Sequence, residues 1–294
     1  MKILLLGKNG QVGWELQRSL APLGTLAAAD RHAAGGDLAR PSDVARLILS
    51  TRPDVVVNAA AYTAVDRAEE QPELARLINA TAVGALAQAC GEIGAWFVHY
   101  STDYVFDGSG DQPWQETDAP GPLNTYGRTK LEGERAIAGG RCRYLLFRTG
   151  WVYAARGVNF PKTVLKLAAE QDELRIIDDQ FGAPTSAELI ADVTAHCLRQ
   201  AMMDDGLAGT YHLAAAGSTT WYDYAGWVLA HGARLRAGAL RIPAMVPVAS
   251  TDFSTPAKRP LNSRLDTSRL QRRFGLCLPA WQDGLERMLA EILQ

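Results

Sequence analysis

The chain has 294 residues, which is enough for one large domain or two smaller ones, and 47% of them are apolar and 21% charged, as in an ordinary globular protein. Its formal net charge of −2 gives no basis for steering toward nucleic acid or an anionic membrane surface, so neither is expected as a partner. No apolar run approaches the length of a membrane span, and the cysteines lack the spacing of a disulfide framework or a zinc site. These features predict a cytoplasmic protein with free thiols.

Short apolar runs alternate with helical patterns through the first half of the chain. Buried strands are predicted, in chain order, at residues 2–7, 25–30, 54–60, 96–102 and 143–150. Helices are predicted between them at 11–24, 42–53 and 72–94, and in the stretch around Tyr126. Strands that are apolar on both faces and separated by helices are typical of a parallel, doubly wound sheet. The sequence therefore predicts a Rossmann-type α/β fold.

The pattern loosens after residue 150. Helices are predicted near 157–170, 186–200, 221–234 and 281–294, and short strands at 174–178 and 209–214. The stretch 242–263 carries prolines and few helical or strand signals, so it is predicted to be a loop. We expect residues 1–150 to form a dinucleotide-binding domain and 151–294 to form mainly a smaller substrate-binding lobe, with some segments crossing back.

Glycines at positions 7, 10 and 13 follow the first predicted strand and open the first helix. A tight turn, a close backbone approach and free amides at a helix N-terminus are what a pyrophosphate requires. Glycines can also end a strand for steric reasons alone. Because this loop joins a strand to a helix at the start of the chain, we interpret it as a nucleotide site.

The second predicted strand ends at Asp30, which can accept hydrogen bonds from an adenosine ribose. Arg31 follows at once and could pair with a 2′-phosphate. The two residues indicate opposite cofactor preferences, so NADPH and NADH both stay open. Asp37 and Leu38 lie in a short stretch that is either a surface turn or a segment beside the adenine.

Tyr126 and Lys130 are four residues apart in a predicted helix and therefore share one face of it. A free phenol has a pKa near 10, and a nearby ammonium lowers that pKa toward the working range of a proton donor. Thr102 ends a predicted strand at the carboxyl edge of the sheet, where α/β folds bind their ligands. These side chains predict proton-transfer chemistry, with a solvated helix face and a capped turn as the alternatives.

Four motifs, in this order and spacing, resemble the extended short-chain dehydrogenase/reductase family. They are GxxGxxG from residue 7, "NAAAYTAVDRAE" from 58, "STDYVFDG" from 101 and "YGRTK" from 126. Three further stretches, "FRTGWVYA", "DDQFGAPTSAELIAD" and "RPLNSRLDTSRL", extend the likeness nearly end to end. Together they resemble the members of that family that reduce dTDP-4-dehydro sugars.

The resemblance assigns roles to individual residues. It places the catalytic trio at Thr102, Tyr126 and Lys130, of which Tyr126 and Lys130 also contact the cofactor. It places further cofactor contacts at Gly7, Gly10, Gln11, Val12, Asp30, Asp37, Leu38, Ala59, Ala60, Ala61, Tyr62 and Thr63. Asp103 and Trp151, together with Thr102, match sugar-side contacts, although a tryptophan after a strand is often an ordinary core residue. Arg259, Asn262 and Ser263 are assigned to the nucleotide end of the substrate, where an arginine suits a pyrophosphate.

The implied reaction is hydride transfer from NADPH or NADH to the C4 ketone of dTDP-4-dehydro-β-L-rhamnose, the last step in making dTDP-L-rhamnose for cell-surface polysaccharide. Tyr126 would donate a proton to the developing alkoxide, Thr102 would hold that oxygen, and Lys130 would tune Tyr126 and bind the nicotinamide ribose. The cofactor would carry the hydride, while the protein supplies orientation and electrostatics.

Three rival functions are weighed against this one. Related sugar-nucleotide dehydratases carry a second acid after the aspartate, but Asp103 is followed by Tyr104. An epimerase or another sugar-nucleotide reductase would keep the Tyr126–Lys130 pair, and the C-terminal motifs favour the reductase over it. A non-catalytic NADP-binding regulatory subunit is disfavoured by the intact trio.

The resemblance also bears on assembly. Some reductases of this type are homodimers with magnesium held by glutamates at the interface. Glu15 and Glu188 match two such positions, although acidic residues on helix surfaces are more often merely solvated. Mg²⁺ and a homodimer are therefore expectations that the sequence does not decide.

Overall fold

A computed structural model describes residues 1–32, 35–236, 240 and 242–293, so the last residue of the helix predicted at 281–294 lies outside the described part. Its centre is a six-stranded sheet in the order β10-β5-β4-β3-β1-β2, in which all neighbours pair in parallel. These strands are β1 (Lys2–Leu6), β2 (Thr25–Ala29), β3 (Val55–Asn58), β4 (Trp96–Thr102), β5 (Arg143–Thr149) and β10 (Gly209–His212). The predicted doubly wound α/β fold is confirmed.

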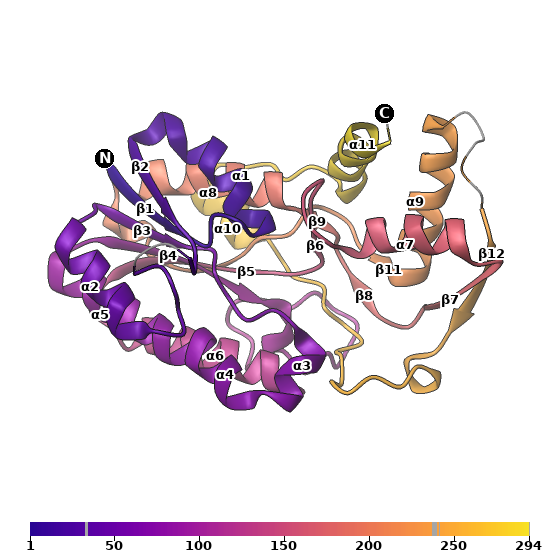
Figure 1. Ribbon diagram of the computed structural model, residues 1–294, viewed down its shortest axis with the longest axis horizontal. Helices are drawn as coiled ribbons and strands as arrows, with labels where there is room; N and C mark the ends of the chain where they lie inside the picture. The colour runs from indigo at the N-terminus through magenta and orange to yellow at the C-terminus, as the bar shows by residue number, and fades with distance from the viewer. Residues whose placement is uncertain (33–34, 237–239, 241, 294) are drawn as a thin grey trace.

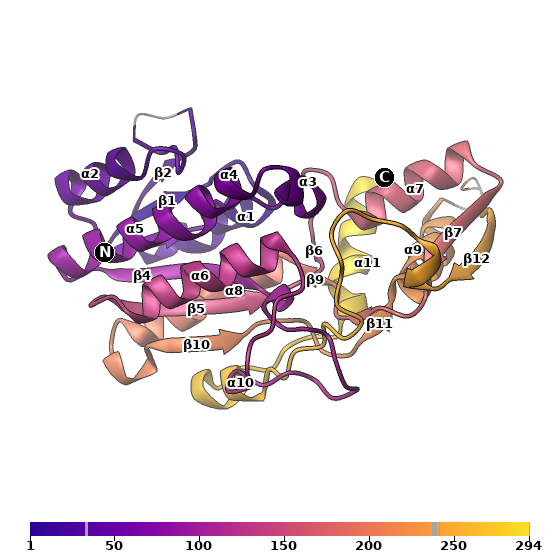
Figure 2. The same ribbon diagram turned by 90° about the horizontal axis from the view of Figure 1, so that it is seen from below.

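Helices cover both faces of this sheet (Figures 1 and 2). One face carries α1 (Gln11–Leu20), α8 (Ala187–Ala201) and α10 (Ser268–Phe274), and the other carries α2 (Pro41–Thr51), α5 (Ala82–Ile93) and α6 (Thr125–Ala138). Successive strand residues point to opposite faces, so Ile3 and Leu5 pack with α1 and α8 while Leu4 and Leu6 pack with α2 and α5. This double burial explains why the strands are continuous apolar runs.

The strand order reverses at β1, which lies between β2 and β3. The chain leaves β1 through α1 on one face and leaves β3 through α5 on the other. The two connections diverge, and a crevice opens beyond the carboxyl ends of the strands, where open α/β sheets bind ligands. The topology therefore fixes the place of the site before any side chain is considered.

The helix predicted at 72–94 is interrupted by one wider turn. It consists of α4 (Pro72–Arg76), a π-helical turn (Leu77–Thr81) and α5, and it is preceded by the short α3 (Val65–Glu70). Within the wider turn Asn79 accepts a hydrogen bond from the Tyr62 N–H at 2.8 Å and donates to the Tyr62 carbonyl at 3.0 Å. The turn thus holds the loop that follows β3, a use typical of π-helical turns at functional sites.

The remaining elements form a smaller lobe, at the right in Figure 1. Its helices are α7 (Phe160–Glu170), α9 (Trp221–Leu235) and α11 (Trp281–Ile292). Its strands pair two by two: β6 (Val152–Tyr153) with β9 (Thr185–Ser186), β7 (Glu173–Ile177) with β12 (Ala244–Val248), and β8 (Phe181–Gly182) with β11 (Thr219–Thr220). Because α8, α10 and β10 belong to the central sheet and its cover, we propose that the lobe is the rest of residues 151–294.

The prediction of a loop at 242–263 is wrong at its start, because β12 pairs in parallel with β7 there. Pro247 lies inside this strand and lacks the N–H that a central strand needs. An edge strand tolerates it, and β12 has a single neighbour in a two-stranded sheet. The proline that argued against a strand in the sequence is therefore compatible with this one.

The four cysteines are free, with Cys277 exposed and the other three buried. Among the helices of the described residues, none combines the length and the apolar composition that crossing a membrane requires.

Candidate active site

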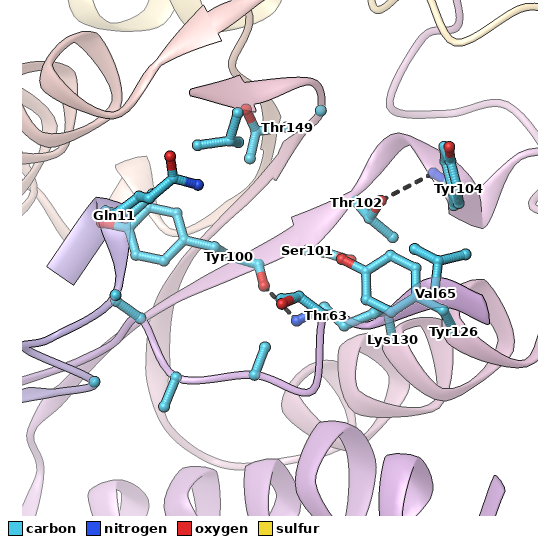
Figure 3. A pocket seen from close by; sticks show the side chains of 18 of the residues that line it. Gln11, Thr63, Val65, Tyr100, Ser101, Thr102, Tyr104, Tyr126, Lys130 and Thr149 are labelled. Carbon is cyan, nitrogen blue, oxygen red and sulfur yellow. Dashed lines mark hydrogen bonds between the residues drawn. The ribbon is translucent and has the colours of Figure 1, made fainter. Parts of the chain in front are cut away.

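A cavity of about 720 Å³ lies at the carboxyl ends of the strands, within the size range of small-molecule sites (Figure 3). Most of the predicted site residues line it: Gly7, Gly10, Gln11, Val12, Asp30, Arg31, Ala59, Ala60, Ala61, Thr63, Thr102, Asp103, Tyr126, Lys130 and Trp151. These residues follow five different strands of the sheet. The fold therefore brings the predicted cofactor side and the predicted catalytic trio into one cavity.

The glycine loop is shaped by close backbone contacts. Gly7 has a φ of +84°, and a Cβ there would lie 2.6 Å from the Ala60 nitrogen. A Cβ on Gly13 would lie 2.0 Å from the Gly7 carbonyl oxygen. Helix α1 begins after Gly10 without a side-chain cap, so its first amides stay free for an anion. These residues fit the pyrophosphate of a dinucleotide.

Asp30 and Arg31 both line the far end of the cavity. The Asp30 carboxylate accepts hydrogen bonds from the Asn9 amide and, at 2.8 Å, from the His32 N–H. Arg31 Nε lies 3.3 Å from His32 Nε2. Either side chain can therefore meet an adenosine ribose. Asp37 and Leu38 do not line the cavity: Asp37 accepts from the Ala39 N–H at 3.0 Å, and Leu38 is buried in the core.

The trio comes from two regular elements. Thr102 ends β4, and its Oγ1 donates to Asp103 Oδ1 at 2.8 Å and accepts from the Tyr104 N–H at 3.1 Å. Tyr126 lies in the first turn of α6, which Asn124 caps by accepting from the Gly127 N–H at 2.8 Å. The Tyr126 ring meets the Tyr104 ring edge-on, with centroids 6.0 Å apart, and points with Thr102 into the cavity (Figure 3).

Lys130 lies one turn farther along α6 and is almost wholly buried. Its Nζ donates to the Tyr100 carbonyl at 2.6 Å (Figure 3). The same nitrogen lies 3.2 Å from His99 Nε2. Burial lowers the pKa of Lys130 to about 8, although Glu134 acts in the opposite direction. The lysine shares a helix face with Tyr126 but directs its amine to the end of β4.

The sequence predicted that Lys130 lowers the pKa of Tyr126, and this is wrong for the geometry observed. Burial of the phenol raises the pKa of Tyr126 to about 12, and a hydrogen bond with Thr102 opposes that rise only in part. The Lys130 amine is engaged by the Tyr100 carbonyl. Helical spacing fixes which face a side chain lies on, but the rotamer of a long lysine depends on the acceptors that the tertiary structure offers.

Asp103 is a buried carboxyl that faces the cavity. Burial raises the pKa of Asp103 to about 6, while hydrogen bonds from Thr102 and Ser263 act against the rise. Among the described residues its Oδ2 has no hydrogen-bond partner. A Cβ on Gly150 would come within 2.4 Å of that oxygen, so glycine leaves it room. Asp103 thus borders the cavity while one of its oxygens, packed against Gly150, is buried without a hydrogen-bond partner among the described residues.

Trp151 and Trp221 form an aromatic wall on the lobe side of the cavity. Their ring centroids are 3.5 Å apart and the planes lie within 8° of parallel. Trp151 has a φ of +50°, which is unusual for a bulky residue and typical of functional sites. A Cβ on Gly182 would lie 2.4 Å from the Trp151 ring, so the wall is packed from behind. Trp221 was not predicted as a site residue, because a tryptophan at the start of a helix carries no sequence signal for such a role.

Three other predicted residues lie outside the cavity lining. The Tyr62 hydroxyl donates to Gln71 at 3.0 Å. Arg259 pairs with both oxygens of Asp66, at 3.1 and 2.7 Å. Asn262 donates to the Gln112 carbonyl at 2.8 Å and accepts from the Arg264 N–H at 3.2 Å. These side chains organise the loops around the cavity, and Arg259 would have to leave Asp66 to meet a pyrophosphate.

The predicted metal ligands lie on α1 and α8, away from the cavity. Glu15 pairs with Arg18 at 3.4 Å and Glu188 with Arg287 at 3.3 Å. Burial raises the pKa of Glu188, and the negative charge of Glu15 contributes to the rise, so the two carboxylates are close enough to repel each other. Within the described residues no group of three or more His, Cys, Asp or Glu side chains could hold a metal ion. One chain alone therefore does not make the predicted site.

The family model described as "RmlD substrate binding domain" matches residues 1–294. The chain belongs to this RmlD family. A dTDP-4-dehydrorhamnose reductase of Escherichia coli (strain K12), similar in sequence, is 57% identical over 294 residues, which cover 99% of this chain and 98% of that protein. The resemblance inferred from the motifs is thereby confirmed.

Solved structures agree with the RmlD assignment. A dTDP-4-dehydrorhamnose reductase from Clostridium acetobutylicum superposes with a TM-score of 0.88 at 35% identity and covers all of both chains. The same enzyme from Bacillus anthracis, solved in complex with NADP, has a TM-score of 0.88 at 32% identity and covers 99% of this chain and 100% of its own. The RmlD fold thus spans the whole chain.

Proposed function

We propose that the protein reduces the C4 ketone of dTDP-4-dehydro-β-L-rhamnose to dTDP-L-rhamnose with NADPH or NADH. The observation that carries the proposal is that Thr102, Tyr126 and Lys130 share one cavity with the glycine loop, which leads into a helix without a side-chain cap. The named relatives in the RmlD family support the same substrate class.

Residues of the glycine loop, Asp30 and Arg31 would hold the dinucleotide, and the loop after β3 would border its nicotinamide half. A bound reduced nicotinamide supplies the hydride. Tyr126 keeps its proton at neutral pH because burial raises its pKa to about 12, so it enters the reaction as a donor. Thr102 would hold the substrate oxygen beside Tyr126 by turning its hydroxyl proton from Asp103 Oδ1 to that oxygen, while the Tyr104 N–H keeps the Thr102 oxygen in place.

Asp103 and the Trp151–Trp221 wall would position the sugar. A small rotation of the Asp103 side chain would bring its buried Oδ2 to the cavity, where it would accept a sugar hydroxyl and gain the hydrogen-bond partner that it lacks. The indole faces give the apolar side of a sugar ring a flat surface. Arg259 would meet the substrate pyrophosphate after exchanging its contact with Asp66.

Location and assembly are also part of the proposal. Four free cysteines support a reducing, cytoplasmic compartment, and the product would enter cell-surface polysaccharide. We propose a homodimer through the α1–α8 face. Mg²⁺ fits poorly within one chain because Glu15 and Glu188 each pair with an arginine. Sedimentation velocity with Mg²⁺ and with a chelator tests both points, since a metal-held dimer dissociates only in the chelator.

The function is tested by mixing the purified protein with the 4-dehydro sugar nucleotide and each reduced nicotinamide. We expect oxidation of the nicotinamide with formation of one dTDP-L-rhamnose per turnover. An epimerase would isomerise the sugar without net oxidation, and a regulatory subunit would bind NADPH without turnover. With dTDP-glucose and NAD⁺ we expect no 4-keto-6-deoxy product by mass spectrometry, and its detection would overturn the reductase assignment.

A further inference from the structure

The Lys130 amine contacts one of two buried side chains, His99 and Asn58, that the proposed mechanism does not use. His99 of β4 and Asn58 of β3 are register partners in the central sheet, and both are 1% exposed. His99 Nδ1 lies 3.2 Å from Asn58 Nδ2, and His99 Nε2 lies 3.2 Å from Lys130 Nζ. An amide, an imidazole and an amine therefore form one hydrogen-bonded row under the cavity.

The direction of this row follows from a contact at its far end. The Ala60 N–H donates to Asn58 Oδ1 at 3.1 Å, so that amide oxygen is an acceptor and Nδ2 is the group that faces His99. Nδ2 can only donate, and His99 Nδ1 must accept. Burial lowers the pKa of His99 and Lys130 lowers it further, and these two effects outweigh a contact with the Asn58 backbone that raises it, so the ring is neutral. Its single proton is then on Nε2, which faces Lys130.

The consequence for Lys130 is a matter of donors and acceptors. An ammonium carries three donors and no acceptor, whereas a neutral amine has one lone pair. One donor is used by the Tyr100 carbonyl at 2.6 Å. Toward His99 an ammonium would place N–H against N–H, while a neutral amine would accept the Nε2 proton.

We propose that Asn58 and His99 are positioning residues that present an N–H to Lys130 and thereby favour its neutral amine, so that the lysine exchanges its proton instead of remaining a permanent cation. The inference rests on the proposed function, in which Lys130 shares the cavity with Thr102 and Tyr126. The other ionisable group that acts on the amine is Glu134 on α6 itself, and Glu134 is paired with Arg148 of β5 at 2.7 Å. Glu134 raises the lysine pKa, so the row acts against it.

The first experiment reads the tautomer in the protein without added nucleotide. The chain has five histidines, and ¹⁵N-labelled imidazole spectra, assigned with a His99→Gln variant, distinguish Nε2–H from Nδ1–H. We expect His99 as the neutral Nε2–H form. An Nδ1–H tautomer or an imidazolium at neutral pH would overturn the proposal.

The second experiment reverses the row. In Asn58→Asp a carboxylate accepts from His99, which moves the ring proton to Nδ1 and turns Nε2 into an acceptor for an ammonium. The titration midpoint of Lys130, followed by ¹³C spectra of the six lysines, should rise by about one unit, because one hydrogen bond contributes roughly that much. An unchanged midpoint would refute the proposal.

A new buried carboxylate also raises a nearby lysine pKa directly, and the His99→Leu background separates the two effects. If the shift passes through the ring, Asn58→Asp should move the Lys130 midpoint clearly less in His99→Leu than in the wild type. An equal shift in both backgrounds would show a plain charge effect and overturn the proposal. None of these measurements depends on turnover. A result that contradicts the role of Asn58 and His99 would therefore not affect the outcome of the reductase assay, and the two proposals can be tested independently.

Discussion

On one side of the cavity Thr102, Tyr126 and Lys130 come from β4 and α6, while on the other side Trp151 and Trp221 come from a loop and from the first residue of α9. The first side is polar, and its buried members Thr102 and Lys130 donate hydrogen bonds to Asp103 and to the Tyr100 carbonyl, which fix their directions. The second side is held by a ring stack 3.5 Å apart, which tolerates sliding. We infer that the β4–α6 side sets the chemistry and the aromatic wall sets how the sugar is received.

The largest effect should follow from a change on the polar side. Tyr126→Phe removes one hydroxyl and keeps the ring packed against Tyr104. General acid catalysis is typically worth about 10²–10⁴-fold, so kcat should fall by at least that order while NADPH affinity changes little. Steady-state kinetics and cofactor titration measure both, and Lys130→Met is the control that should weaken NADPH binding as well. A Tyr126→Phe enzyme with near-normal kcat would remove the basis of the mechanism.

A second test asks what the polar side costs in stability. Burial raises the pKa of Asp103 from 3.8 to about 6, so the folded state binds its proton more tightly than the unfolded state. Below the unfolded-state pKa the carboxyl therefore does not lower the folding stability. The loss of stability builds up as the pH rises from the unfolded-state pKa to the folded-state pKa, and it is complete above the latter. Two pKa units correspond to roughly 3 kcal/mol as an upper bound, so Asp103→Asn should be more stable than the wild type at neutral pH by up to that amount.

Urea unfolding near pH 4 and near pH 7 checks this sign, since the gain should be absent at the lower pH. Asp107→Asn is a control of opposite sign, because hydrogen bonds from Ser109 lower the pKa of that exposed carboxyl. A loss of stability in Asp103→Asn at neutral pH would show that burial of this carboxylate is not a net cost.

The aromatic wall should respond less strongly and in another parameter. Trp221→Ala removes the stacking partner of Trp151, and such a pair contributes about 0.5–1.5 kcal/mol. The KM for the sugar nucleotide should rise up to about tenfold, with kcat changed less. Trp227→Ala is the matched control: it removes a stack on His231 from the same helix, outside the cavity, and should leave KM unchanged. A fall in kcat alone would place Trp221 on the chemical side.

The smallest effect is expected at the end of the cavity that would hold the adenosine of the cofactor. Arg31→Ala should weaken NADPH more than NADH, because only NADPH offers a 2′-phosphate to the guanidinium. A charge-assisted hydrogen bond at an exposed site suggests a difference of roughly tenfold or less. Titration of both cofactors measures it, and Arg31→Lys should retain part of the preference. Equal losses would show that Arg31 does not contact the 2′-phosphate.

The two sides of the cavity also differ in how far the sequence could predict them. Gly7, Thr102 and Tyr126 were found because each stands at the end of a strand or in the first turn of a helix, and parallel strands bring such positions to one edge. The place of Trp221 was not predicted, because it depends on a two-stranded sheet and on the positive φ of Trp151. The contact of Arg259 was not predicted either, because its loop is bound to Asp66. Such contacts join residues far apart in the chain and leave no periodic pattern.

By itself the sequence determined the doubly wound sheet, the glycine loop and the helix face shared by Tyr126 and Lys130, because periodicity and backbone sterics act over a few residues. Only the tertiary structure decided where the Lys130 amine points, that the pKa of Tyr126 rises, and that His99 and Asn58 lie beneath it. Burial and hydrogen-bond direction depend on which groups the packed strands and helices bring within reach, and the spacing of residues along one helix does not contain that information.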